Sequence, residues 1–182
     1  MAASGKVEPL KKNRSIPNHA SITRPLPDHG TMEILPANLF DINALRHLEK
    51  VCFPTDAWPL LDLVSVLSFS DTVRLKAVEN GQMIGFVAGD PRPREGISWI
   101  ATICVLPEYR GKGIGRTLLE TCENRLPTDL IHLCVRISNE EAIRMYRMAG
   151  YSNIDRWAKY YTDGEDGLVM EKLKGIGAKS AL

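Results

Sequence analysis

Glycine and basic residues alternate over Arg110–Arg116, which reads Arg-Gly-Lys-Gly-Ile-Gly-Arg. The stretch follows an apolar segment that stops at Pro107 and leads into an amphipathic one. Glycine lets a backbone approach a ligand closely, and the first amides of a helix lack partners within the helix. Such amides, at the positive end of the helix, bind phosphate groups. The pattern therefore favours a pyrophosphate cradle over a plain glycine-rich turn. Its spacing matches neither a Walker P-loop nor the dinucleotide motif G-x-G-x-x-G.

Two segments further along the chain hold polar and aromatic residues at set spacings. Residues 135–151 read Val-Arg-x-Ser-Asn-x-x-Ala-Ile-x-x-Tyr-x-x-x-Gly-Tyr, where x is any residue. Within them Ser138 and Glu141 stand at the spacing of a capping box, which begins a helix. Residues 160–170 read Tyr-Tyr-Thr-Asp-Gly-Glu-Asp-Gly-Leu-Val-Met and combine two tyrosines with a run typical of a turn.

Taken in order, the three segments resemble motifs of the GNAT superfamily of acyl-CoA-dependent N-acyltransferases. Arg110-x-x-Gly113-x-Gly115 is similar to the superfamily signature [QR]-x-x-G-x-[GA], in the same context of strand and amphipathic helix. The last segment resembles the C-terminal hairpin of one branch, the protein N-α-acetyltransferases, which include bacterial enzymes acting on ribosomal proteins. The resemblance covers residues 31–174. It implies a cytoplasmic enzyme that transfers acetyl from acetyl-CoA directly to the N-terminal α-amine of a protein or peptide, a ribosomal protein being one such substrate.

The same resemblance implies where acetyl-CoA binds as co-substrate. In the superfamily two central parallel strands splay apart, and the thioester lies in the notch between them. Here these strands are residues 97–106 and 130–137. The first would pair its backbone with the pantetheine arm, the glycine loop would hold the pyrophosphate, and Asn139 would bond near the thioester. The implied cofactor-binding residues are Ile103, Cys104, Val105, Arg110, Gly111, Lys112, Gly113, Ile114, Gly115, Arg116, Asn139 and Tyr146.

Acetyl transfer requires a neutral amine, a positioned thioester and a proton for the leaving thiolate. Tyr146 occupies the superfamily position whose phenol protonates the sulfur of the departing CoA. Its spacing from Ile143 also fits an ordinary core aromatic. We take Tyr146 as the candidate catalytic acid.

The group that receives the amine proton is harder to identify. In the bacterial relatives a glutamate stands two residues before the residue matching Arg136, and here that position is Cys134. A thiol is a poor substitute for a carboxylate as a base. Other N-α-acetyltransferases use an acid in the loop after the first helix, where Asp56 lies one residue beyond the aligned position. His132, on the strand face of Cys134, and Glu49 are weaker candidates.

The substrate amine itself bears on how much a missing base matters. An α-amine, with a pKa of about 7.7–8.0, is partly neutral at pH 7, whereas a lysine amine at about 10.4 is almost fully protonated. The cysteine therefore weakens a lysine or polyamine substrate more than an N-terminal one. Two walls are predicted around the acceptor, formed by Phe53, Pro54 and Trp58 on one side and by Tyr160 and Tyr161 on the other.

Periodicity and turn residues predict the elements that position these groups. Strands are expected at 32–35, 72–79, 82–89, 97–106, 130–137, 151–160 and 168–173. Helices are expected after Asn38, at 58–69, at 113–126 and from Ser138 to Gly150. The predicted fold is α+β, a GNAT-like three-layer arrangement with one mixed central sheet of about seven strands and about four helices. Its central parallel strands are splayed.

Length and composition agree with one such domain. The chain has 182 residues, 44% of them hydrophobic, which suffices for a core without disulfides or metal. Its four cysteines form no C-x-x-C pair, so we expect no metal site and a reducing compartment. No apolar run approaches the ~18 residues of a membrane span. A net charge of +1 points to neither nucleic acid nor membrane as a partner.

The ends of the chain differ from its middle. Residues 1–30 hold four of the 11 prolines and carry a net charge of +3, without helix or strand periodicity. We expect a disordered extension there, with weak contact to ribosomal RNA as the alternative. Residues 31–174 would form the N-acetyltransferase domain, and residues 175–182 a disordered tail.

Two other functions fit part of the pattern. A small-molecule amine acetyltransferase would keep the cofactor motifs but would not need the hairpin after Tyr160. An acyl-CoA-binding protein that lost its base at Cys134 would keep the cofactor motifs without turnover.

Overall fold

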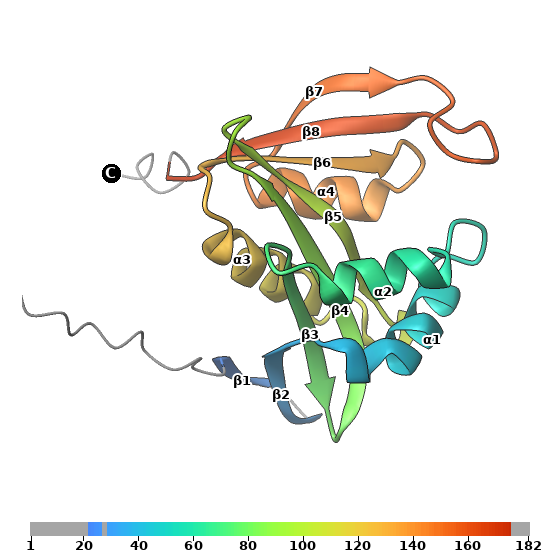
Figure 1. Ribbon diagram of the computed structural model, residues 1–182, viewed down its shortest axis with the longest axis vertical. Coiled ribbons are helices and arrows are strands. Elements are labelled where there is room, and N and C mark those ends of the chain that lie inside the picture. Colours follow the sequence, from blue (N-terminus) through green and yellow to red (C-terminus); the bar gives the residue numbers. More distant parts are fainter. Residues whose placement is uncertain (1–21, 27–28, 176–182) are drawn as a thin grey trace, which may run out of the picture.

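The computed structural model describes residues 22–26 and 29–175. Eight strands form one mixed sheet in the order β1-β2-β3-β4-β5-β6-β8-β7 (Figure 1). The strands are β1 (Ile22–Leu26), β2 (His29–Pro36), β3 (Val73–Glu79), β4 (Gln82–Arg92), β5 (Ile97–Val105), β6 (Leu130–Arg136), β7 (Ser152–Trp157) and β8 (Gly167–Leu173). The helices are α1 (Ile42–Cys52), α2 (Leu60–Ser68), α3 (Ile114–Arg125) and α4 (Glu140–Met148), with the 3-10 turns η1 (Leu39–Asp41) and η2 (Pro107–Tyr109).

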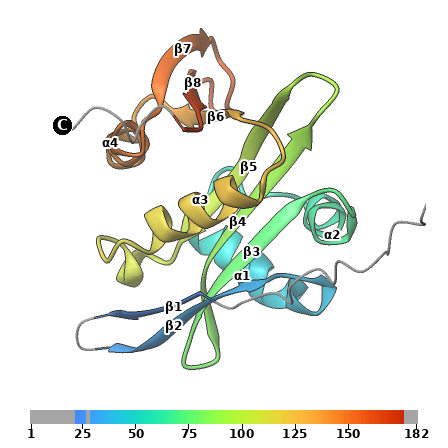
Figure 2. The same ribbon diagram turned by 90° about the vertical axis from the view of Figure 1, so that its left-hand side faces the viewer.

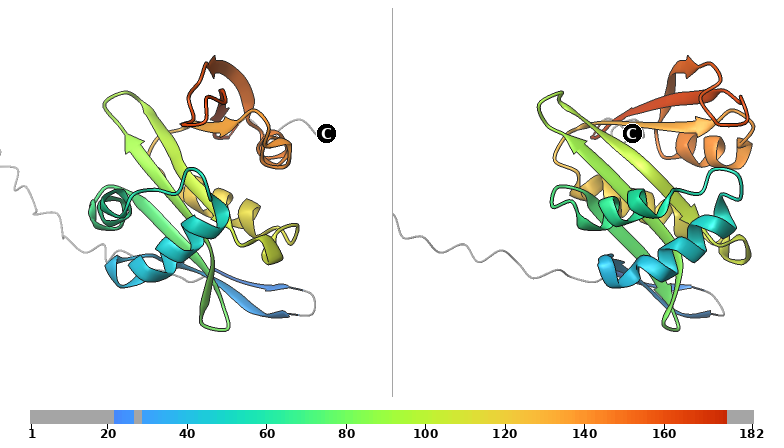
Figure 3. Two further views of the ribbon diagram at one scale, coloured as in Figure 1. Left: turned by 90° about the vertical axis from the view of Figure 1, so that its right-hand side faces the viewer. Right: turned by 45° about the vertical axis from the view of Figure 1, so that its right-hand side comes forward.

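The helices cover both faces of the sheet, giving three layers (Figure 2). α3 and α4 lie against one face of the sheet. α1 and α2 cross the other face and lie in front of the sheet in Figure 3. α3 packs on β3, β4 and β5 because its apolar residues recur at helical spacing, and Ile114, Leu118, Leu119 and Cys122 are buried. The predicted α+β fold, with a mixed sheet and four helices, is confirmed.

Several local signals in the sequence act as predicted. Asn38 begins the first helical segment, where its side chain accepts a hydrogen bond from the Phe40 amide while its own amide donates to Asp41, both at 2.9 Å. Asn80 and Gly81 both have positive φ, +51° and +79°, as the tight turn between β3 and β4 requires. The Asn80-Gly81 turn therefore helps to fix the register between β3 and β4.

The N-terminal prediction differs from the structure. Residues 22–26 and 29–30, expected in a disordered extension, belong to β1 and β2, which pair antiparallel with Ile22 opposite Ile34. A strand that pairs along an exposed edge needs backbone hydrogen bonds more than apolar periodicity, so the pattern did not reveal it. Residues 1–21, 27–28 and 176–182 of the two predicted tails lie outside the described residues.

Two further boundaries shift. The cap of α4 is Asn139, whose side chain accepts from the Ala142 amide at 3.1 Å, and not Ser138. The Ser138 amide instead donates to Glu165 at 2.8 Å. β7 ends at Trp157, short of the predicted Tyr160, because the backbone turns at Lys159 with a φ of +52°. The Lys159 amide donates to Asp166 at 2.8 Å, which holds this turn.

The centre of the sheet carries an irregularity that opens it. Consecutive β4 residues Ala88 and Gly89 pair with Thr102 and Ile100, so Ala101 of β5 is an extra residue, a β-bulge. Ile100 and Thr102 therefore face opposite sides of the sheet. β5 pairs in parallel with β6 only from Ile97 to Ile100, and beyond the bulge the two strands separate. The predicted splay of the central parallel strands is confirmed.

The described residues hold no helix long and apolar enough to cross a membrane. Within the same residues there is no group of three or more His, Cys, Asp or Glu side chains placed to hold a metal ion.

Candidate active site

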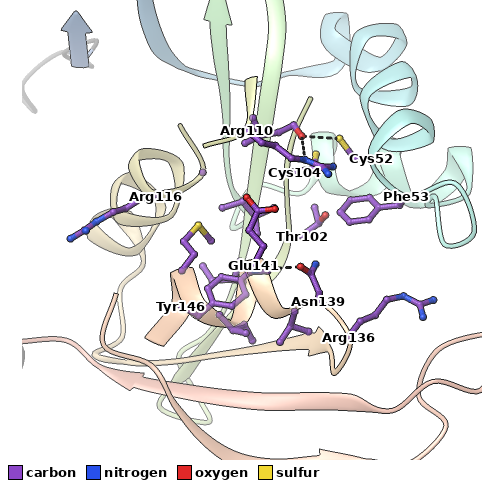
Figure 4. Close-up of a pocket in the computed structure, with 18 of the residues that line it drawn as sticks. Cys52, Phe53, Thr102, Cys104, Arg110, Arg116, Arg136, Asn139, Glu141 and Tyr146 are labelled. Atoms are coloured by element: carbon purple, nitrogen blue, oxygen red, sulfur yellow. Dashed lines mark hydrogen bonds between the residues drawn. The ribbon is translucent and has the colours of Figure 1, made fainter. Parts of the chain in front are cut away.

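A cavity of about 680 Å³ opens where β5 and β6 separate (Figure 4). Its walls come from the α1–α2 loop, the second half of β5, the glycine loop, β6, α4 and the loop after β7. All but two of the predicted site residues line it. Lys112 instead lies with its ammonium 4.9 Å from the centre of the Tyr109 ring. Tyr160 packs its ring against Tyr161 and Trp157, at centroid distances of 5.1 and 5.2 Å.

The glycine loop forms one end of the cavity. Gly111 and Gly113 have φ of +72° and +80°, a region that favours glycine, and a Cβ built on either would meet nothing within 4 Å. Gly113 is also the N-cap of α3, with no side-chain cap on the first amides. Arg110 and Arg116 line the same end, although Arg116 also pairs with Glu120 at 2.7 Å. Open space, free amides and positive charge suit a pyrophosphate.

The β5 edge leading away from the loop is already partly bonded. The carbonyl of Val105 accepts hydrogen bonds from Arg110 Nε at 3.1 Å and from Cys52 Sγ at 3.4 Å (Figure 4). A hydrogen bond between the thiols of Cys52 and Cys104 lowers the pKa of Cys52 and raises that of Cys104. The backbone between Ala101 and Val105 has no pairing with β6, so this edge can bond an extended ligand.

Tyr146 faces the cavity from α4 (Figure 4). It is 5% exposed and packs edge-on against Tyr151, with ring centroids 5.8 Å apart. Burial raises the pKa of its phenol, so the hydroxyl keeps its proton across the neutral range. A protonated phenol beside the cavity is what a catalytic acid requires, and the same contacts serve the core.

Cys134 lies on the β6 wall, beside Tyr161. Burial raises the pKa of its thiol, which is therefore neutral near pH 7. β8 comes very close here, since a Cβ built on Gly167 would lie 2.5 Å from Cys134 Sγ. The space around this thiol is therefore tight.

Asp56 belongs to a set of charges that we call the Arg136 clamp: Arg136, Asp56, Asp163 and Glu165. Arg136 donates to Asp56 from Nε at 2.9 Å, to Asp163 at 2.9 Å, and to Glu165. The other oxygen of Asp56 accepts from Thr162 at 3.1 Å. The Arg136 guanidinium also lies 4.1 Å from the centre of the Tyr161 ring. The clamp joins the α1–α2 loop to the loop after β7 across the cavity, and both oxygens of Asp56 are engaged in it.

The two weaker base candidates occupy different settings. His132 does not line the cavity; it pairs with Glu171 at 2.8 Å and packs against Trp99, 5.1 Å between ring centroids. Glu49 is 1% exposed and lies behind the cavity wall, where its carboxylate accepts from Thr102 Oγ1 at 3.4 Å and from the Trp58 amide at 3.5 Å.

Sequence reasoning missed several lining residues, among them Thr102 and Glu141. Thr102 was overlooked because it lies before the part of β5 that the predicted cofactor site covers, and its contact with Glu49 depends on the bulge. Glu141 was interpreted as part of a capping box, yet it lines the cavity from the first turn of α4 (Figure 4). Its position two residues after Asn139, in the first turn of the same helix, was the signal that could have found it.

A model of the acetyltransferase (GNAT) family matches residues 42–151, from the start of α1 to the turn before β7. The chain belongs to this family.

Relatives of this GNAT chain include an N-acetyltransferase of Methanocaldococcus jannaschii named as uncharacterized. It is 33% identical over 142 residues, which cover 74% of this chain and 86% of that protein. An N-alpha-acetyltransferase of Sulfurisphaera tokodaii is 27% identical over 150 residues, with coverages of 74% and 88%. The crystal structure of the ribosomal-protein-S18-alanine N-acetyltransferase from Escherichia coli matches with a TM-score of 0.70 at 25% identity, covering 83% of this chain and 99% of that one. The predicted resemblance to N-α-acetyltransferases is confirmed, and the chain is an N-acetyltransferase by family.

Proposed function

We propose that this protein transfers acetyl from acetyl-CoA to the N-terminal α-amine of a protein or peptide. The observation that carries the proposal is the continuity of the cavity. It runs from the glycine loop along the unpaired β5 edge to an acceptor end between the α1–α2 loop and the loop after β7. The names of the Sulfurisphaera tokodaii and Escherichia coli relatives agree with this substrate class.

The residues present fit acetyl-CoA. The amides around Gly111 and Gly113, with Arg110 and Arg116, would hold its pyrophosphate, because the space that a Cβ would fill is open there. The backbone of Ile103 would bond the pantetheine arm. Bound in this way, acetyl-CoA would supply the thioester carbonyl at the notch, within reach of Tyr146 on α4.

The acceptor end suits the first residues of an extended chain. Phe53, Pro54 and Trp58 line one side and Tyr161 the other, so rings flank the space where a first side chain would pack. The Arg136 clamp bridges the two sides. We expect an extended N-terminus to enter beside this bridge more readily than a bulky folded region.

In the reaction the neutral amine attacks the carbonyl carbon, so a C–N bond forms and the C–S bond breaks. Tyr146 gives its phenolic proton to the leaving sulfur, and burial keeps that proton in place beforehand. An α-amine is neutral in roughly a tenth to a sixth of molecules at pH 7, so the chemistry does not depend on a strong base to the extent that a lysine would.

A panel of acceptors tests the proposal. Purified protein and acetyl-CoA are offered peptides with free N-termini and the same peptides with a blocked N-terminus and one lysine. Polyamines and aminoglycosides complete the panel. CoA release gives rates, and mass spectrometry locates the acetyl group. We expect acetylation of free N-termini. Turnover of polyamines or aminoglycosides alone would favour the small-molecule alternative, and acetyl-CoA binding without turnover would favour a binding protein.

A further inference from the structure

Acetyl transfer needs a group that receives the proton of the attacking amine. The thiol of Cys134 is neutral near pH 7, because burial raises its pKa. Both oxygens of Asp56 already accept hydrogen bonds, from Arg136 and from Thr162. His132 is paired with Glu171 and does not line the cavity. None of these three groups therefore presents a free base to the cavity.

Glu49 has the properties of a functional carboxylate. It lies in the last turn of α1 and is 1% exposed, yet its two hydrogen bonds are long, at 3.4 and 3.5 Å. Among the described residues no Lys, Arg or His pairs with it. A buried carboxylate with weak partners costs stability. A carboxylate in such a setting is a candidate for a chemical role.

Thr102 connects this carboxylate to the cavity. The bulge at Ala101 turns Thr102 toward α1, and its hydroxyl donates to Glu49 Oε1 at 3.4 Å. Thr102 also lines the cavity just past Ile100, the last β5 residue paired with β6 (Figure 4). A hydroxyl donates and accepts at once, so it can receive a proton from the cavity side while it gives its own to Glu49.

We propose that Glu49, acting through the Thr102 hydroxyl, receives the proton that the acceptor amine loses during acetyl transfer. The inference rests on the proposed function. As the C–N bond forms, the amine proton passes to Thr102 Oγ1, directly or through one water, and the Thr102 proton passes to Glu49 Oε1. The C–S bond breaks, and the thiolate takes the phenolic proton of Tyr146. Solvent then returns the proton of Glu49 to the Tyr146 phenolate, so the protons balance over one turnover.

The electrostatic setting of Glu49 supports this role. Burial raises its pKa from that of an exposed glutamate, and the hydrogen bonds from Trp58 and Thr102 lower it only in part. A raised pKa brings a carboxylate closer to the pH at which a base works best. The other titratable groups that face it are the thiols of Cys52, on its own helix, and Cys104, on β5, with Arg110 beyond Cys52.

The test is the pH dependence of kcat with a peptide acceptor. For the wild type, kcat should fall at acid pH as Glu49 becomes protonated. Both proteins need a neutral amine, so in both kcat should fall about tenfold per pH unit below the pKa of the bound amine. Only the wild type should fall more steeply, about a hundredfold per unit, below the pKa of Glu49; Glu49→Gln should lack this second fall, and its kcat at pH 7 should be about 10²-fold lower. The dissociation constant of acetyl-CoA should stay the same. Glu49→Asp should recover part of the rate.

Matched variants separate a relay from a structural effect. Thr102→Val should give the same profile as Glu49→Gln, Thr102→Ser should keep the wild-type profile, and the double variant should be no worse than either single one. Glu79→Gln, which changes a buried glutamate of β3 that does not line the cavity, should leave the profile unchanged. If Glu49→Gln folds poorly, the two Thr102 variants carry the test.

Three results would overturn the proposal: a wild-type profile in Glu49→Gln, a lower kcat with an unmoved profile, or loss of the acid limb in Asp56→Asn instead. A wild type that acetylates no peptide but does acetylate a small amine would refute the proposed substrate class. The same profiles recorded with that amine would then decide the role of Glu49 separately.

Discussion

In the proposed reaction, Tyr146 supplies the proton that the leaving sulfur takes. Replacing it with Phe removes one oxygen and leaves the ring packing against Tyr151 in place. We expect kcat to fall about 10²-fold because the leaving sulfur loses its proton donor. Isothermal calorimetry should find the acetyl-CoA dissociation constant nearly unchanged. An unchanged kcat, with chemistry shown to be rate-limiting, would make Tyr146 a core aromatic only.

Gly113 tests the cradle. Gly113→Val places a branched side chain in open space at the N-cap of α3, where phosphate oxygens would meet the backbone. Losing one or more charge-assisted hydrogen bonds should weaken acetyl-CoA binding by about tenfold to a hundredfold. Gly96→Val is the matched control, because Gly96 has a similar φ of +74° and open space but does not line the cavity. Equal affinities in the two variants would refute the cradle.

At this scale the sequence predicted residue types better than their partners. The glycine loop, Asn139 and Tyr146 could be predicted as cavity residues because contiguous motifs carry them. The ion pair of Asp56 could not be predicted, because its partner Arg136 is 80 positions away in the sequence. The interaction depends on how two loops meet. The contact of Thr102 with Glu49 could not be predicted, because it depends on a β-bulge that the pattern of apolar residues does not reveal.

Among the elements, the α1–α2 loop and the loop after β7 act as a pair, since the Arg136 clamp joins them. Asp56→Asn removes one charge from the clamp and leaves the shape of the side chain. We expect the peptide KM to rise about fivefold, the equivalent of ~1 kcal/mol, because the two walls lose their link. The acetyl-CoA dissociation constant should not change.

Asp62→Asn controls for the lost charge, because Asp62 is an exposed acid in the first turn of α2 and does not line the cavity. A change in acetyl-CoA affinity without a change in peptide KM would show that the clamp supports the cofactor end instead.

The sequence predicted the elements correctly where a cap, a turn or a regular apolar stripe marks them. Asn38, the Asn80-Gly81 turn and the apolar stripe of α3 gave correct elements. β1 and the end of β7 could not be placed, because strand pairing at an edge and a turn held by Asp166 depend on contacts between distant segments. For the same reason the sequence did not predict the shape of the acceptor end, which depends on how the α1–α2 loop meets the loop after β7.

Across the whole molecule, the two halves of the sheet meet along a short seam. β5 and β6 pair over four positions, from Ile97–Leu130 to Ile100–Leu133. Glu123 of α3 adds a second link between the halves, because α3 packs on β3, β4 and β5 while Glu123 contacts residues of the other half. Its carboxylate is 4% exposed and accepts from Tyr151 at 2.9 Å and from Lys172 of β8 at 2.6 Å.

Glu123→Ala should therefore lower the free energy of unfolding by about 3 kcal/mol, because it leaves a lysine and a phenol partly buried without their partner. Urea unfolding measures the loss. Glu120→Ala, which breaks an exposed pair with Arg116, should cost at most about 0.5 kcal/mol. Equal losses in the two variants would mean that the Glu123 contacts add nothing to the seam.

The cleft depends on one extra residue in β5, the bulge at Ala101. Deleting that residue would remove the bulge, whereas substituting it would not. Without Ala101, Ile100 and Thr102 would be neighbours and would still face the sides that they face now, so the core would keep its side chains. Only the bend would disappear, and β5 could then pair with β6 further along. Deleting Ala101 should therefore give a more continuous and more stable sheet. The cleft would close, and the acetyltransferase activity would be lost.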